Sequence, residues 1–177
     1  MPEQMRDPRG KSATTFLGYT AYRLARALNR AAENTALARG ATLPQLFILQ
    51  VLGEGVPLSN ADVARRTFVS SQAAHIVVSE LVDAGLVERI ADASNRRVRL
   101  LRLTDDGWRL LAECEPEIRE REERLIRAVD IDSVSSLTDA LTQAADVLAG
   151  GYFGDKAAEA AAVAARRRRP RGGIAPS

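Results

Sequence analysis

A short polar segment in the middle of the chain carries side chains that suit contact with a nucleic acid. The amide of Gln72 can bond an adenine at two points, and the hydroxyl groups of Ser70 and Ser71 can bond a phosphate. His75 can bond either DNA or a neighbouring helix. Ile76 can contact a thymine methyl but can bind neither phosphate nor guanine. These residue types predict base contacts, provided that a rigid element presents them.

Two consecutive arginines, Arg96 and Arg97, form a second group with this chemistry. Arginine can enter a minor groove, where narrow A·T tracts strengthen the negative potential. We expect Arg96 to lie the deeper of the two. The alternative is a solvated turn, so this expectation depends on the element that carries the pair.

Catalysis and metal binding lack the residues that they need. One cysteine, Cys114, and one histidine, His75, are too few for a Cys/His zinc site. Gly53 and Gly55 indicate a turn rather than a phosphate loop, and no nucleophile has a histidine partner. We therefore predict neither an enzyme nor a cofactor. Cys114 is expected to be a buried, unreactive thiol, because no basic neighbour or second cysteine is evident to activate it.

The composition is that of one globular domain with a core. Of the 177 residues, 46% are hydrophobic and 27% are charged. No stretch approaches the roughly 20 apolar residues that span a bilayer, and the N-terminus lacks the apolar region of an export signal, so we expect a cytoplasmic protein. The formal net charge is only +2, and residues 104–154 contain more acidic than basic residues. DNA binding must therefore depend on where individual arginines lie.

Helical periodicity accounts for the first part of the chain. Apolar residues recur at helical spacing from about residue 15 to residue 39, and Gly40 stands where a helix-ending glycine belongs. Thr42 then precedes Pro44 like a helix cap, and a second helix is predicted to run to Gly53.

Two shorter helices with a tight connection follow. Ser59 can cap the first, with Asp62 near the positive end of its dipole. Ser70 or Ser71 can cap the second, which ends at Gly85. The packing face of the first helix is expected to comprise Ala61, Val63, Ala64 and Phe68. The spacing is that of a helix-turn-helix.

The second of these helices has two different faces. At 100° per residue, its packing side groups Ala74, Val77, Val78 and Leu81. The opposite side groups Gln72, Ile76, Ser79 and Asp83. The residues expected to contact DNA from this helix are Ser70, Ser71, Gln72, His75, Ile76 and Ser79.

The periodicity then changes from about 3.6 to about 2. Residues 86–90 and 98–103 alternate as strands around a polar turn at 92–95, which places Arg96 and Arg97 at the tip of a hairpin. A helix-turn-helix followed directly by a hairpin is a winged helix. Thr104 can then cap a long amphipathic helix, and another covers about 134–148. The fold class is mainly α with a small β-hairpin wing, and its long N- and C-terminal helices predict a homodimer.

Several segments, taken in order, resemble the MarR family of bacterial regulators. They are Leu43–Leu46, Ser59–Ala64, Val69–Ser70, Leu81–Arg89, Asp92–Arg97 and Leu103–Gly107. The resemblance covers roughly residues 15–150 and is specific because the order and spacing of the segments agree. It implies a homodimer joined through its N- and C-terminal helices, with each lobe reading half of a palindromic operator. Many members release DNA when a small phenolic or lipophilic ligand or an oxidant acts; for this chain we expect a small-molecule effector and do not predict oxidant sensing.

The chain departs from the family pattern at two positions. Asn95 stands where the wing usually carries an aspartate, so an ion pair that would brace an arginine becomes a neutral hydrogen bond. Ile76 stands where the recognition helix often has a basic residue. Both departures support an alternative function, a winged-helix interaction module that has lost specific DNA binding.

By the same resemblance, an effector site would lie between the dimer helices and the reading lobe. Its aromatic lining would come from Tyr19, Tyr22, Phe47 and Trp108. For each of these residues a role in the core is the simpler alternative. The expected effector is a small aromatic or lipophilic molecule.

These inferences divide the chain into three parts. Residues 1–14 form a disordered N-terminus, and residues 15–154 form the winged helix with its dimerisation helices, the DNA-binding lobe covering about 42–104. Residues 155–177 form a disordered Ala/Arg-rich tail, which either holds phosphates without regard to sequence or simply aids solubility. The predicted function is that of a sequence-specific transcriptional regulator that binds double-stranded DNA.

Overall fold

The computed structural model describes residues 12–92, 98–129 and 132–149. The chain divides into two compact units, residues 1–43 and residues 44–177, and each is described by itself. The predicted wing tip, with Asn95, Arg96 and Arg97, lies outside the described residues. The Ala/Arg-rich tail and most of the predicted disordered N-terminus lie outside them as well.

The first unit is a single long helix with a short 3-10 turn before it. The turn covers Ala13–Thr15, and helix α1 covers Leu17–Leu37, within the predicted limits. Gly40 adopts a φ of 74°, and the N–H of Ala41 donates to the carbonyl of Ala36 at 3.0 Å. This is the glycine-ended helix terminus that the sequence predicts.

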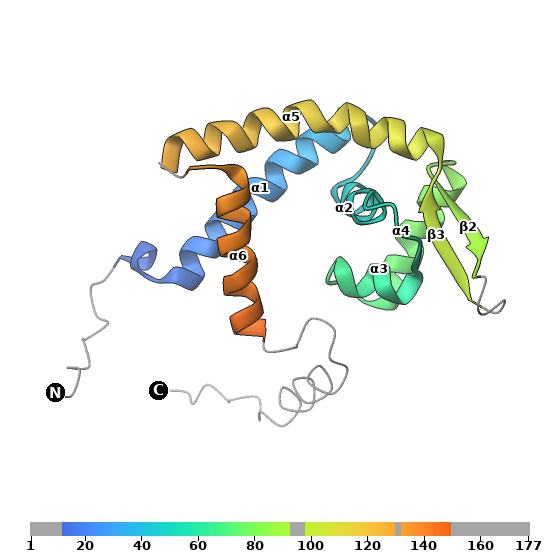
Figure 1. The fold of residues 1–177 in the computed structure, drawn as a ribbon, viewed down its shortest axis with the longest axis horizontal. Coiled ribbons are helices and arrows are strands. Elements are labelled where there is room, and N and C mark those ends of the chain that lie inside the picture. Colours follow the sequence, from blue (N-terminus) through green and yellow to red (C-terminus); the bar gives the residue numbers. More distant parts are fainter. Residues whose placement is uncertain (1–11, 93–97, 130–131, 150–177) are drawn as a thin grey trace, which may run out of the picture. The chain divides into compact units, whose positions relative to one another are not determined.

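The second unit contains the helix-turn-helix, the sheet and the two C-terminal helices (Figure 1). Its elements are α2 (Leu43–Leu52), β1 (Leu58–Ser59), α3 (Asn60–Arg66), α4 (Ser71–Asp83), β2 (Val87–Ala91), β3 (Arg99–Leu103), α5 (Asp105–Val129) and α6 (Val134–Ala149). The sheet is antiparallel with the order β1-β3-β2. The predicted hairpin is confirmed as β2 and β3. The third strand, β1, was not predicted, because its two residues are too few to show an alternation.

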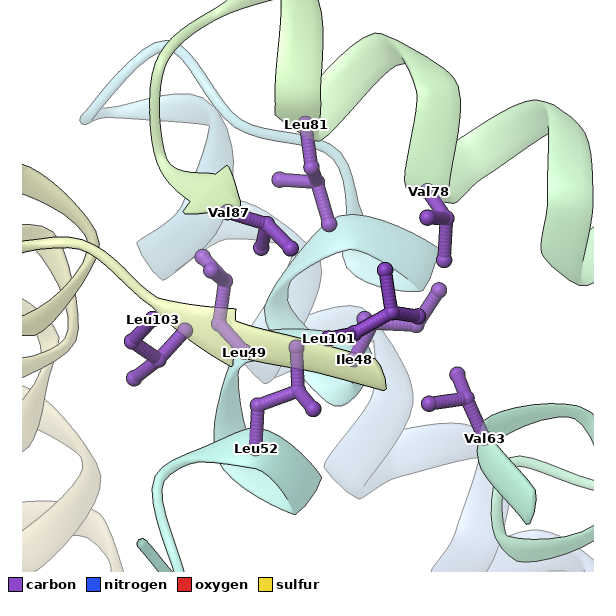
Figure 2. Close-up of a cluster of buried hydrophobic side chains, with 9 residues drawn as sticks. All are labelled: Ile48, Leu49, Leu52, Val63, Val78, Leu81, Val87, Leu101 and Leu103. Atoms are coloured by element: carbon purple, nitrogen blue, oxygen red, sulfur yellow. The ribbon is translucent and has the colours of Figure 1, made fainter. Parts of the chain in front are cut away.

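The core of this unit is built from five elements, one of which is β3, the middle strand of the sheet. Figure 2 shows its side chains pointing toward one another from α2, α3, α4, β2 and β3. They are Ile48, Leu49, Leu52, Val63, Val78, Leu81, Val87, Leu101 and Leu103. Burial of these side chains fixes the angle at which α4 crosses the sheet, and it accounts for the helix-turn-helix and the wing forming one body.

The end of α3 differs from the prediction. Phe68 was expected on the packing face of α3, but it is 69% exposed and has a φ of 58°. The helix ends at Arg66, and the N–H of Val69 donates to the carbonyl of Ala64 at 3.1 Å. Phe68 therefore occupies the left-handed position that a glycine usually takes after a helix. Ala61 is exposed as well. Of the four residues predicted for that face, Val63 and Ala64 are the two that are buried.

Hydrogen bonds of Thr104, the residue before α5, join the start of α5 to the segment just after α4. The hydroxyl of Thr104 donates to the carbonyl of Gly85 at 2.6 Å and accepts from the N–H of Gly107 at 3.1 Å. The N–H of Thr104 donates to the carbonyl of Leu86 at 3.1 Å. A Cβ atom on Gly107 would lie 2.1 Å from the carbonyl oxygen of Leu86. Glycine is therefore required at position 107.

We expect Gly107→Ala to lower the free energy of unfolding by about 2 kcal/mol or more, because the backbone of α5 or of Leu86 must shift. Gly18→Ala is the matched control, since no atom lies within 4 Å of a Cβ at Gly18 and alanine favours a helix by up to about 1 kcal/mol. Denaturant unfolding measures both. Equal stability of Gly107→Ala and the parent chain would contradict the close contact.

Candidate DNA-binding interface

Two side chains set the start of α4. The hydroxyl of Ser70 caps the helix by accepting a hydrogen bond from the N–H of Ala73 at 3.1 Å. The amide of Asn60, the first residue of α3, donates to the carbonyl of Ser71 at 3.1 Å. These bonds fix the turn between α3 and α4. They leave Ser70 and Ser71 exposed at the positive end of the helix dipole.

The two predicted faces of α4 are present. Ala74, Val78 and Leu81 are buried, and Val77 is partly buried. Gln72, His75, Ile76 and Asp83 are exposed. Ser79 is only half exposed, and its hydroxyl accepts a hydrogen bond from the guanidinium of Arg89 at 3.2 Å. The contacts of these residues with DNA remain a prediction.

The charges of α4 are confined to its C-terminal half. The helix contains no lysine or arginine in Ser71–Asp83, and its first turn contains no acidic residue. Glu80 accepts a hydrogen bond from the amide of Gln45 at 3.1 Å, and Asp83 lies at the end. The N-terminal half therefore presents neutral polar and apolar groups only.

The wing supplies positive charge beside α4. Strand alternation places Arg89 and Arg99 on the sheet face that carries the core residues. The hydrogen bond from Arg89 to Ser79 shows that this face looks toward α4. Ser79 is neutral, and Arg89 forms no ion pair within the part of the chain that the structure describes. The opposite face carries Glu88 and Arg102, which form an ion pair at 2.7 Å.

Arg89 was not predicted to belong to the site. Strand alternation is the signal that identifies it, because Arg89 is two residues after the buried Val87 and so shares its face. The approach of Arg89 to α4 also depends on the crossing angle of helix and sheet, which the pattern does not give.

The two arginines of α3 form ion pairs with carboxylates of the same chain. Arg65 pairs with Asp62 at 2.7 Å, and Arg66 pairs with Glu54. The hydroxyl of Ser59 accepts from the N–H of Asp62 at 3.2 Å and donates to its carboxylate at 2.6 Å. The bond from Ser59 is the main cause that holds the pKa of Asp62 below its usual range, and Arg65 adds to the effect.

The remaining predicted residues lie on separate elements. Tyr19 and Tyr22 are exposed on α1 in the first unit. In the second unit Phe47 is half-buried on α2, and Trp108 is exposed on α5. Cys114 on α5 is 1% exposed, as expected of a buried thiol. Among the described residues no group of three or more acidic, cysteine or histidine side chains could hold a metal ion. None of the described helices combines the length and the apolarity that a membrane span needs.

A capped helix-turn-helix with a neutral reading face, flanked by a basic wing, defines a winged-helix protein of the DNA-binding class. Residues 39–98 match the MarR family. The chain is 34% identical over 110 residues to the HTH-type transcriptional repressor Rv2887 of Mycobacterium tuberculosis. The aligned residues cover 62% of this chain and 79% of that relative. The chain belongs to the MarR family, whose members are transcriptional regulators and not enzymes.

Solved structures agree with this assignment. A MarR family regulator from Silicibacter pomeroyi has a TM-score of 0.71 at 25% identity, covering 81% of this chain and 95% of that chain. Rv2887 in complex with p-aminosalicylic acid has a TM-score of 0.59 at 29% identity, covering 72% and 97%. PcaV from Streptomyces coelicolor, in complex with its natural ligand, has a TM-score of 0.62 at 25% identity, covering 77% and 96%.

We expect the contribution of the α3 cap to stability to depend on pH. Because the pKa of Asp62 is lowered in the folded chain, its carboxylate stabilises the fold above the ordinary aspartate pKa of about 3.9. That contribution is lost as the pH falls through the lowered pKa. Ser59→Ala removes the main cause of the shift and a helix cap, which together cost about 1 kcal/mol near neutral pH.

Unfolding free energies of the parent chain and Ser59→Ala, measured from pH 6 down to pH 3, check this expectation. The difference between the two proteins should narrow toward the acid end. If the difference in unfolding free energy stays constant over this range, Ser59 stabilises the fold only by accepting from the N–H of Asp62, and its bond to the carboxylate contributes nothing.

Proposed function

We propose that this protein is a sequence-specific, double-stranded-DNA-binding transcriptional repressor that acts as a homodimer on a palindromic operator in the cytoplasm. The observation that carries the proposal is the pairing of α4 with Arg89. The neutral N-terminal half of the exposed α4 face, which can enter a major groove, lies beside an arginine that bonds neutral Ser79 and forms no ion pair with the described residues. Such a pairing separates base contacts from phosphate contacts.

The roles follow from where each side chain lies. Ser70 and Ser71, at the N-terminus of α4, bind a phosphate through hydroxyl and backbone N–H groups. Gln72 and His75 reach base edges from exposed positions in the first turns. Ser79 contributes through Arg89, which its hydroxyl orients toward the DNA backbone.

Arg96 and Arg97, outside the described residues, are proposed to enter the minor groove. β2 and β3 support this proposal because they extend the hairpin beyond the core toward residues 93–97. The basic residues Arg89 and Arg99 lie along the same hairpin. A wing with this charge suits a phosphate-lined groove.

Dimer formation and effector release complete the proposal. Long helices with exposed apolar side chains, including Leu17 on α1 and Val147 on α6, support a second copy of the chain as their partner. The relative Rv2887 was solved with p-aminosalicylic acid, which supports a small aromatic effector. Tyr19, Tyr22, Phe47 and Trp108 remain the candidates to contact it.

The alternative, a winged-helix interaction module without specific DNA binding, has one observation in its favour. Ile76 is 54% exposed on the reading face. An exposed apolar side chain there suits a protein partner as well as a base. Arg89 and Arg99 favour DNA over this alternative, because a basic hairpin suits the phosphates of any duplex, whereas it suits only a protein partner with an acidic surface.

Selection of bound fragments from a random duplex pool, at two salt concentrations, tests the proposed function. We expect an inverted repeat whose half-sites are about one helical turn apart, since a two-fold dimer presents two copies of α4. Equal binding of all sequences at both salts would overturn the regulator and favour the interaction module.

We expect Arg89→Ala to weaken binding to all duplexes alike and to reduce the slope of log affinity against log salt by about one per protomer. The reason is that a phosphate contact releases counterions without reading sequence. Affinities for the selected operator and for an unrelated duplex, each at several salt concentrations, give both quantities.

Arg102→Ala is the matched control. It removes the same charge from the same hairpin, but Arg102 lies on the opposite face and is paired with Glu88. An equal effect of the two substitutions would mean that only the total charge of the wing matters, and Arg89 would lose its assigned role.

A further inference from the structure

Ile76 has no structural reason to be apolar. It is 54% exposed, whereas its helix neighbours Ala74 and Val78 are at most 1% exposed and already form the packing side of α4. An exposed isoleucine also favours a helix less than a lysine, arginine or glutamate does. Neither the core nor the helix therefore accounts for this residue.

The surroundings of Ile76 limit what it can contact. Gln72 lies one helical turn before it on the same exposed side, and Arg89 is held beside the next turn by Ser79. Acidic side chains on α4 begin only at Glu80. An apolar group between a neutral amide and a cation suits a surface that carries both methyl groups and phosphates. The major groove at a T·A pair is such a surface, because thymine presents a C5 methyl group there.

The lack of lysine and arginine in α4 has a second consequence. Arginine and lysine make the commonest specific contacts with guanine, through its O6 and N7 atoms. α4 has neither residue, so beside His75 the base contacts open to its exposed side are those of Gln72 with adenine and of Ile76 with thymine. These two side chains are about 6 Å apart along the helix axis. With a rise of about 3.4 Å per base pair, they reach base pairs that are at most about two steps apart.

We infer that Ile76 is a specificity-determining residue that reads the C5 methyl group of a thymine, within about two base pairs of an adenine read by Gln72. The operator half-site therefore contains A·T pairs at the centre of the α4 contact. This inference rests on the proposed function and names the bases that the same surface prefers.

Replacing single thymines of the selected operator by deoxyuridine tests the inference, because it removes one methyl group and keeps the base pairing. With the full-length protein, we expect one thymine in a half-site at which deoxyuridine weakens binding about fourfold, the factor that one buried methyl group corresponds to. With Ile76→Ala the same replacement should have no effect. Ile76→Val, which keeps a branched side chain, should retain part of the dependence.

Val56→Ala serves as the matched control, since Val56 is 60% exposed on a loop outside α4. It should keep the full response to deoxyuridine. Thermal unfolding of each variant checks that the fold is unchanged, as expected for substitutions at exposed positions.

Each outcome decides the inference. A methyl dependence that disappears in Ile76→Ala supports it. If a specific operator is bound but no thymine methyl matters, or if its loss matters equally in Ile76→Ala, the inference is overturned while the proposed function stands. If no sequence is preferred at all, both are overturned. A change in dimer formation by Ile76→Ala with no change in methyl dependence would assign the residue to a protein contact instead.

Discussion

Two backbone carbonyl groups just after α4, those of Gly85 and Leu86, accept hydrogen bonds from Thr104, the residue before α5. These bonds tie the segment that follows α4 to the residue that caps α5. They also hold the first turn of α5 close enough to Leu86 that only glycine fits at position 107. Helix α4, strand β2 and helix α5 therefore share one rigid junction. A displacement of α5 at this point moves the end of α4 with it unless the bonds break.

Charge is divided between the elements of the lobe. The exposed N-terminal half of α4 presents neutral groups, the arginines of α3 are paired with carboxylates, and the hairpin carries Arg89 on the face toward α4. Under the proposed function, α4 would contact bases and Arg89 would contact phosphates, so specificity and affinity would come from different elements.

Most of the fold follows from local signals in the sequence. Gly40 and Gly85 mark helix ends, Ser59 and Ser70 mark helix starts, and the change of period after Gly85 marks the wing. Each of these signals acts within a few residues, so it is readable without tertiary information. The side of α4 that faces outward also follows from helical geometry alone.

The features that were missed depend on contacts between distant segments. Phe68 looked like part of an apolar stripe, but the chain leaves the helix two residues earlier and turns it outward. β1 is visible only through its pairing with β3, some 40 residues on. The contact of Arg89 with Ser79 requires the crossing angle of α4 and the sheet, which the packed core sets. Periodicity gives the face of an element but not its neighbour.

The single cysteine gives this protein a built-in probe of its own motions. Cys114 lies inside α5 with 1% of its surface exposed, so a thiol reagent reaches it only when that part of the helix opens. When opening and closing are fast compared with the chemical step, the labelling rate under native conditions gives the free energy of opening. Comparison with the free energy of global unfolding then shows whether α5 opens alone or only with the whole domain. No engineered label is needed, and there is no second thiol to confuse the signal.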